Sequence, residues 1–147
     1  MSEAGTAAAV AEAMWAEDNA SRGLGMRLDH AGEGRATLSM TVTEAMVNGH
    51  GICHGGFIFA LADSAFAFAC NWTDERTVAA SCAITYVRPA RLGMRLTAEA
   101  VETVRLGRSG VTDVTVRDET GAVIAVFRGN SRTIGGRITG AATEGER

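Results

Sequence analysis

The 147 residues fit one domain spanning positions 1–147, and a chain of this length can bury a hydrophobic core. Fourteen cationic side chains against seventeen acidic ones leave a formal net charge of −3, so the basic excess expected of a nucleic-acid-binding protein is absent. All fourteen cations are Arg, which excludes Schiff-base chemistry and a phosphate-loop lysine.

No segment of the sequence has the features of a membrane or export signal. Residues 1–10 lack the basic start and apolar core of a signal peptide, and the apolar run 57–70 is too short to span a bilayer. We therefore expect a cytoplasmic protein that binds neither membranes nor nucleic acid. Cys53, Cys70 and Cys82 are an odd number of cysteines, so we expect reduced thiols rather than disulfides.

The first half of the chain predicts a helix, a strand and a second, longer helix. Residues 7–21 are Ala-rich with helical spacing of apolar side chains, and two glycines stop the pattern. Residues 35–42 alternate between polar and apolar side chains, which predicts a strand with one buried face, and residues 24–29 are a candidate strand before it. Residues 57–71 contain no Pro or Gly and are apolar on every side, which predicts a helix enclosed by a curved sheet and a partner surface.

The second half predicts four strands with turns between them. The segments 78–88, 95–105, 110–117 and 122–128 are separated by Pro89, Gly107 and the turn 118–121. Four successive strands indicate an antiparallel meander, and together with the earlier strand they predict an α+β domain whose sheet curls around the long helix. The small and polar tail 141–147 is expected to be frayed.

One carboxylate, Asp63, lies inside the apolar helix. An unpaired carboxylate is costly to bury unless it is hydrogen-bonded or has a catalytic use. A desolvated slot would raise its basicity, whereas hydrogen bonds from backbone or hydroxyl groups would indicate a structural role. The small and aromatic side chains near it on the helical wheel are Gly56, Ala60, Ala67, Phe59 and Phe66.

Gly55 and Gly56 lie where this helix should begin. Their N–H groups have no intrahelical acceptor and could hold a developing oxyanion, although a flexible loop leading into a helix is an equal alternative. Asp63 follows Gly55 by eight residues, which places it about 12 Å along the helix axis. If both act on one substrate, they must come from facing subunits, so the spacing predicts a symmetric dimer with two interfacial sites.

His50, Cys53 and His54 raise two other possibilities. Three potential zinc ligands within five residues, with Asp63 as a fourth, match no common zinc spacing, so we expect no metal. Cys53 as a nucleophile with His54 as its base is chemically possible, but the spacing does not show how the two side chains would meet. Hydrogen bonding within the loop is the simpler role for both histidines.

The segment from Asn48 to Asp63 resembles the signature of hotdog-fold acyl-CoA thioesterases, of the type associated with phenylacetic acid degradation. The resemblance covers nearly the whole chain and includes residues 42–43, 87–89, 127–129 and 134–136. It implies a hotdog fold, in which a curled antiparallel sheet wraps a central helix. It also implies that two such units pair into one continuous sheet and that the homodimers assemble into a homotetramer.

The family resemblance also implies roles for individual residues. The Gly55 amide would polarise the thioester carbonyl, while Asp63 of the facing subunit would act as general base or nucleophile. Asn48 would orient water or substrate, and His54 would shape the loop or aid carbonyl binding. Position 67, a hydroxyl residue in some related enzymes, is Ala here, so water positioning would fall to Ser64 or Asn48. No metal or cofactor is implied.

The implied substrate is an aryl-acetyl-CoA such as phenylacetyl-CoA or hydroxyphenylacetyl-CoA, which makes an acyl-CoA the small-molecule partner. Gly56 and Ser64 would lie in the substrate-binding region, the acyl group would contact Phe59, Phe66 or Phe68, and an arginine-bearing rim would hold the CoA phosphates. Two alternatives are a non-catalytic acyl-CoA binding module and a hotdog-fold hydratase or dehydratase. The arginines considered for the rim are Arg88, Arg91, Arg128 and Arg132.

Overall fold

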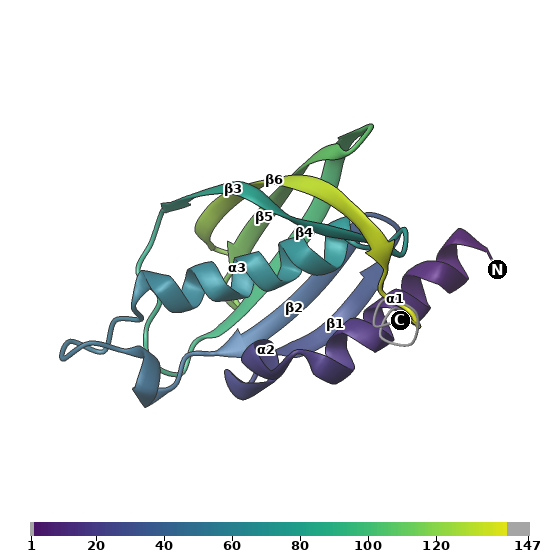
Figure 1. Ribbon diagram of the computed structural model, residues 1–147. Coiled ribbons are helices and arrows are strands. Elements are labelled where there is room, and N and C mark those ends of the chain that lie inside the picture. Colours follow the sequence, from purple (N-terminus) through teal and green to yellow (C-terminus); the bar gives the residue numbers. More distant parts are fainter. Residues whose placement is uncertain (1, 141–147) are drawn as a thin grey trace.

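The computed structural model describes residues 2–140, and Figure 1 traces the elements in chain order. The predicted frayed tail, 141–147, lies outside the described residues. No described helix is long and apolar enough to cross a membrane. The elements are α1 (Glu3–Glu17), α2 (Asn19–Gly23), β1 (Arg27–Gly32), β2 (Arg35–Thr41), the short 3-10 helix η1 (Glu44–Met46), α3 (Gly55–Cys70), β3 (Glu75–Tyr86), β4 (Arg95–Leu106), β5 (Ser109–Arg117) and β6 (Val123–Arg137).

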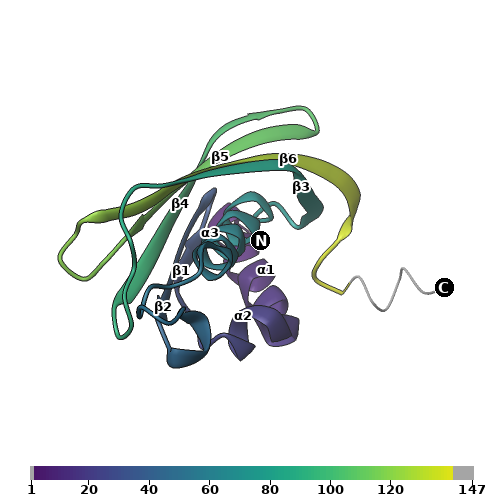
Figure 2. The same ribbon diagram turned by 90° about the vertical axis from the view of Figure 1, so that its left-hand side faces the viewer.

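One six-stranded antiparallel sheet, in the order β1-β2-β4-β5-β6-β3, forms the main layer. Figure 2 shows this sheet curving over α3, with α1 and α2 on the other side of that helix. The sheet is not closed into a barrel, because β1 and β3 are its two edges. The arrangement confirms the predicted α+β class and the hotdog fold, a curled sheet around a long central helix.

The predicted meander of four successive strands is wrong in one respect. Strands β4, β5 and β6 do follow one another as hairpins, but β3 pairs with β6 along almost its whole length and does not pair with β4. Polar–apolar alternation identifies a strand and its buried face but not its neighbour, which depends on where the preceding connection leaves the chain. As a result β3 is an edge strand, with Val78, Tyr86 and the following Val87 exposed.

Two boundaries in the N-terminal region also differ from the prediction. The single predicted helix at 7–21 is two helices, because Asp18 ends α1 and its side chain accepts a hydrogen bond from the Ser21 N–H to cap α2. The candidate strand at 24–29 lies slightly later in the chain, as β1. In the C-terminal half, β6 extends to Arg137, well beyond the predicted strand end at 128.

The apolar side of α3 packs on the concave face of the sheet. Gly129 of β6 makes this approach possible, since a Cβ atom built there would lie 2.6 Å from a ring carbon of Phe66. Phe127, two residues earlier on β6, packs against both Phe66 and Phe59 with ring centroids 5.8 and 5.4 Å apart. The opposite side of α3 is a half-exposed stripe rather than a fully enclosed surface, and it consists of Gly56, Ala60, Asp63 and Ala67.

We predict that Gly129→Ala destabilises the fold by about 1–3 kcal/mol, because the added methyl group overlaps the Phe66 ring in a close-packed core. Urea unfolding gives the free energy directly. Gly23→Ala is the matched control, since its Cβ meets nothing within 4 Å and Ala suits a helical position better than Gly. Equal stability of both variants and the wild type would contradict this account of the packing.

Candidate active site

The first turn of α3 is held by the loop that precedes it. His54 is the N-cap residue; its side chain is exposed and makes no capping hydrogen bond. The Cys53 N–H donates to the Ala90 carbonyl at 2.8 Å, and the His54 N–H donates to the Met46 carbonyl at 2.8 Å. These two bonds attach the loop to neighbouring segments on both sides, so the start of the helix has a defined position.

The backbone N–H groups of Gly55 and Gly56 point away from the helix without an acceptor. Within residues 2–140, no backbone or side-chain oxygen accepts a hydrogen bond from either group. The positive end of the helix dipole lies at the same place. An incoming carbonyl or oxyanion would therefore find two unused donors, as the sequence predicted.

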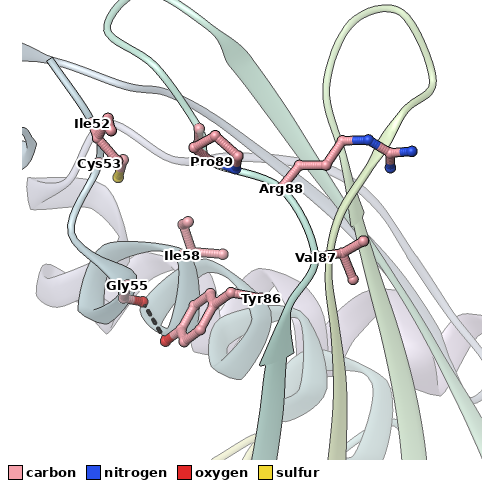
Figure 3. Close-up of a pocket in the computed structure, with 9 residues that line it drawn as sticks. Ile52, Cys53, Gly55, Ile58, Tyr86, Val87, Arg88 and Pro89 are labelled. Atoms are coloured by element: carbon pink, nitrogen blue, oxygen red, sulfur yellow. Dashed lines mark hydrogen bonds between the residues drawn. The ribbon is translucent and has the colours of Figure 1, made fainter.

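Tyr86, at the end of β3, lies against Gly55 and was not identified from the sequence. Its hydroxyl donates to the Gly55 carbonyl at 2.8 Å, drawn as the dashed line in Figure 3. A Cβ atom on Gly55 would lie 2.7 Å from the Tyr86 ring, so only glycine allows this contact. A pocket of about 370 Å³ opens beside the pair, lined by Ile52, Cys53, Gly55, Ile58, Tyr86, Val87, Arg88, Pro89 and Ala90.

Asn48 organises the loop before the helix. Its side-chain oxygen accepts hydrogen bonds from the N–H groups of His50 and Ile52, at 2.9 and 3.1 Å. The Asn48 backbone also pairs with Ile52 and Gly51. The amide side chain therefore closes a turn that leads into the helix start, a structural role compatible with the predicted role in orienting water or substrate.

Asp63 is a half-buried carboxylate on the small-residue stripe of α3. Burial raises the pKa of Asp63 above its ordinary value. In the part of the chain that the structure describes, its oxygens make no hydrogen bond or ion pair, so the structural alternative of a satisfied carboxylate finds no support. Cys82 of β3 lies near enough that its thiol pKa is raised first by burial and then by the Asp63 charge. A basic carboxylate of this kind suits a general base.

Within one chain the helix start and Asp63 do not meet. Asp63 is not among the residues that line the pocket beside Gly55, and eight residues of helix separate the two by about 12 Å. The edge strand β3, next to α3, has no strand partner on its outer side among the described residues. The geometry is therefore compatible with a site completed by a second copy, as the spacing predicted.

Ser64 is engaged with the N-terminal helices. Its hydroxyl lies 2.7 Å from that of Ser21, which in turn donates to the Asp18 carboxylate at 2.7 Å. Because the single hydroxyl proton of Ser21 goes to Asp18, Ser64 is the donor in its bond with Ser21. The predicted role of Ser64 toward substrate or water is therefore limited to accepting a hydrogen bond.

The aromatic side chains expected to contact the acyl group occupy two environments. Phe66 and Phe68 are buried in the core, and Phe68 also packs against Trp15 of α1 with ring centroids 6.1 Å apart. Phe59 is only partly buried, at the edge of the cluster around Phe127. Of the predicted aromatic contacts, Phe59 is thus the one with an exposed part.

The predicted arginine rim is divided between two places. Arg88 lines the pocket beside Gly55 and donates to the Val123 carbonyl at 2.7 Å. Arg128 instead forms a two-pronged ion pair with Asp113, at 2.7 and 2.9 Å, which holds the pKa of that carboxyl below its usual range. Arg91 and Arg132 are exposed. Arg88 alone of the four lies at the pocket.

The geometry does not support the two alternatives of a zinc site and of Cys53 as a nucleophile. Residues 2–140 contain no group of three or more His, Cys, Asp or Glu side chains placed to bind a metal ion. All three cysteines are free. Burial raises the pKa of the Cys53 thiol, which disfavours the thiolate that a nucleophile needs.

Comparison with known proteins gives the family. The thioesterase superfamily model matches residues 50–125, which include the helix start and Asp63. The chain belongs to the thioesterase superfamily. It is 43% identical over 132 residues to the acyl-coenzyme A thioesterase PaaI of Escherichia coli, covering 90% of this chain and 94% of the relative. The predicted resemblance and enzyme class are thereby confirmed.

Solved structures agree with this assignment. E. coli PaaI, from the phenylacetic acid degradation operon, superposes with a TM-score of 0.90 at 40% identity, covering 92% of this chain and 99% of that one. A mutant of the phenylacetic acid degradation protein PaaI from Thermus thermophilus gives a TM-score of 0.74 at 38% identity, covering 78% and 97%. A hypothetical thioesterase protein from Streptococcus pneumoniae, solved with coenzyme A, shares the fold at 20% identity, with a TM-score of 0.73 and coverage of 76% and 88%.

We predict that Asp63→Asn is more stable than the wild type at pH 7 and that the gain shrinks as the pH falls toward 4. The pKa of Asp63 is higher in the folded chain than its ordinary 3.8, so ionisation of this carboxyl opposes folding. The wild type therefore loses stability as the pH rises from the ordinary pKa through the raised pKa of the folded chain. Denaturant unfolding at several pH values measures the difference. A variant less stable than wild type at pH 7 would show that the carboxylate is satisfied in the native protein.

Proposed function

We propose that this thioesterase hydrolyses aryl-acetyl-CoA thioesters of the phenylacetyl-CoA or hydroxyphenylacetyl-CoA type to the free acid and coenzyme A. The observation that carries the proposal is Asp63, a half-buried carboxylate of raised pKa that has no hydrogen-bond or ion-pair partner among residues 2–140. It lies on the helix that begins with the N–H groups of Gly55 and Gly56, which have no acceptor among the same residues. The E. coli relative, named for acyl-coenzyme A thioester hydrolysis, supports the substrate class.

In the proposed reaction the Gly55 N–H donates to the thioester carbonyl and stabilises negative charge as the carbonyl carbon becomes tetrahedral. Asp63 takes a proton from water, whose oxygen forms the new bond to that carbon. The carbon–sulfur bond then breaks, and the CoA sulfur leaves as a thiol by taking the proton back from Asp63, which restores the carboxylate. Direct attack by Asp63, giving a mixed anhydride that water cleaves, reaches the same products. A thioester carbonyl is weakly resonance-stabilised, so polarisation and a positioned carboxylate suffice without a metal or cofactor.

The two groups would act together across a dimer interface. About 12 Å of helix separates them in one chain, so the Gly55 of one subunit would face the Asp63 of its partner. The exposed edge of β3 supports this arrangement, because a second copy could continue the sheet there. A tetramer of two such dimers and a cytoplasmic location stay predictions.

Around this centre the remaining residues have proposed supporting roles. Asn48 shapes the loop and orients water or substrate, and His54, exposed at the N-cap, assists carbonyl binding. Arg88, at the pocket, is the best placed of the arginines for a CoA phosphate. The aryl group would contact the exposed part of Phe59, with Gly56 leaving room for the approach.

Thiol release from a panel of acyl-CoAs tests the function. With phenylacetyl, hydroxyphenylacetyl, benzoyl, acetyl and medium-chain CoA, we expect the aryl-acetyl forms to be turned over fastest by the wild type. Asp63→Asn should lose at least about 100-fold in kcat because the base is absent, while remaining folded and assembled. Gly23→Ala serves as an active control variant.

Two other outcomes would favour a different function. Retained acyl-CoA binding without thiol release by the wild type would favour the binding-module alternative. Addition or removal of water on an enoyl-CoA would favour the hydratase alternative, although such an enzyme would want a His beside the carboxylate.

Mixing inactive chains tests the shared site. Gly55→Ala, whose added methyl group would collide with Tyr86, and Asp63→Asn should each be inactive alone. Unfolded and refolded together in equal amounts, they should recover about a quarter of wild-type activity, since half of the random dimers carry one intact site of two. No recovery, with mixed dimers verified by mass spectrometry, would refute a site shared between subunits.

A further inference from the structure

We propose that Tyr86 is a positioning residue for the carbonyl-polarising start of α3: its hydroxyl fixes the peptide group between Gly55 and Gly56, so that the Gly56 N–H serves as a second donor to the oxyanion. This inference rests on the proposed function. It starts from a contact that the reaction scheme above does not use, the 2.8 Å hydrogen bond from the Tyr86 hydroxyl to the Gly55 carbonyl shown in Figure 3.

The geometry of the peptide bond carries the first step. The Gly55 carbonyl and the Gly56 N–H belong to one planar peptide group, and in a trans peptide the two point in opposite directions. A bond that fixes the carbonyl therefore fixes the N–H. Both glycines lie in the first turn of α3, and this turn is easier to distort than one of other residues because neither glycine has a Cβ atom to limit its dihedral angles. The Tyr86 hydroxyl adds a second restraint to the one that the helix itself supplies.

The same bond also strengthens the donor. A hydrogen bond accepted by a carbonyl polarises its peptide group, and this raises the donor strength of the N–H by about 10–30% in condensed-phase estimates. The Gly56 N–H has no acceptor among residues 2–140, so its capacity is not used within the chain. A polarised and unused donor next to the Gly55 N–H matches the requirement for holding a tetrahedral oxyanion.

The two glycines differ in the space around them. A Cβ atom at Gly55 would collide with Tyr86, whereas a Cβ atom at Gly56 would meet nothing within 4 Å. Gly55 is thus small because Tyr86 packs on it, and Gly56 is exposed to solvent. Gly55 therefore has a backbone position fixed by Tyr86, and Gly56 contributes an N–H that has no acceptor among residues 2–140.

Tyr86 is itself held firmly enough to act as a restraint. It pairs with Ala125 of β6, and the next two residues, Val87 and Arg88, both donate backbone hydrogen bonds to the Ile124 carbonyl at 2.7 and 3.2 Å. These bonds continue the strand attachment just beyond the tyrosine. The position of the Tyr86 backbone relative to α3 is therefore set by the sheet.

Tyr86→Phe is the direct test, because it removes the hydroxyl and keeps the ring. We expect kcat for the best acyl-CoA to fall about 10-fold with KM within twofold, since the bond acts mainly on the transition state. The amide nitrogen chemical shift of Gly56 should also change in two-dimensional NMR spectra. The matched control is Thr85→Val, which removes a hydroxyl from the opposite face of β3 and should leave kcat and the Gly56 shift as in the wild type.

Three results would overturn the inference. Unchanged kcat in Tyr86→Phe would show that the hydroxyl does not assist the reaction. A raised KM at constant kcat would make Tyr86 a substrate-binding contact instead. An unchanged Gly56 amide shift would show that the peptide group keeps its state without the bond. Failure of the proposed function is distinguishable, because then the wild type itself would release no thiol.

Discussion

The packing of α3 against the curved sheet is the interaction on which the rest of the structure depends. Leu61, Ala62, Ala65 and Ala69 are fully excluded from solvent, so this face of the helix lies directly on the strands. Small side chains let the backbones approach, and Gly129 admits the Phe66 ring. Once this face is buried, the position of the helix start and the outward direction of the opposite stripe are both determined.

The N–H donors at the start of α3 and the Asp63 carboxylate depend on that one helix in different ways. At its first turn the backbone supplies donors and dipole, and the preceding loop and Tyr86 hold the turn in place. Further along, Asp63 is raised in basicity by partial burial rather than by a charged neighbour. The free energy lost by partly burying this carboxylate is offset by the large apolar contact on the other side of the helix. A straight helix cannot bring these two features together, which is why the proposed mechanism requires a second chain.

Much of the fold and part of the candidate site could be predicted from the sequence. The helix 57–71, the strands and the α+β class followed from hydrophobic periodicity. Asp63 stood out as a carboxylate in an apolar segment, and Gly55 and Gly56 stood out because they lie where that helix begins. The pairing of β3 with β6 could not be predicted, since the alternation of polar and apolar side chains along a strand does not determine which strand lies next to it. Tyr86 was also missed, because 31 residues separate it from Gly55 and nothing in its local sequence distinguishes it from another strand residue.

By itself, the sequence determined which side chains are apolar, where helices and strands can form, and which residues carry chemistry. These properties are local, and they depend on spacing within one element. Only the tertiary structure decided that Ser64 is bonded to Ser21, that Arg128 is paired with Asp113 while Arg88 lines the pocket, and that Tyr86 reaches Gly55. These contacts join distant parts of the chain, and their formation depends on strand order and packing rather than on any local pattern of residues.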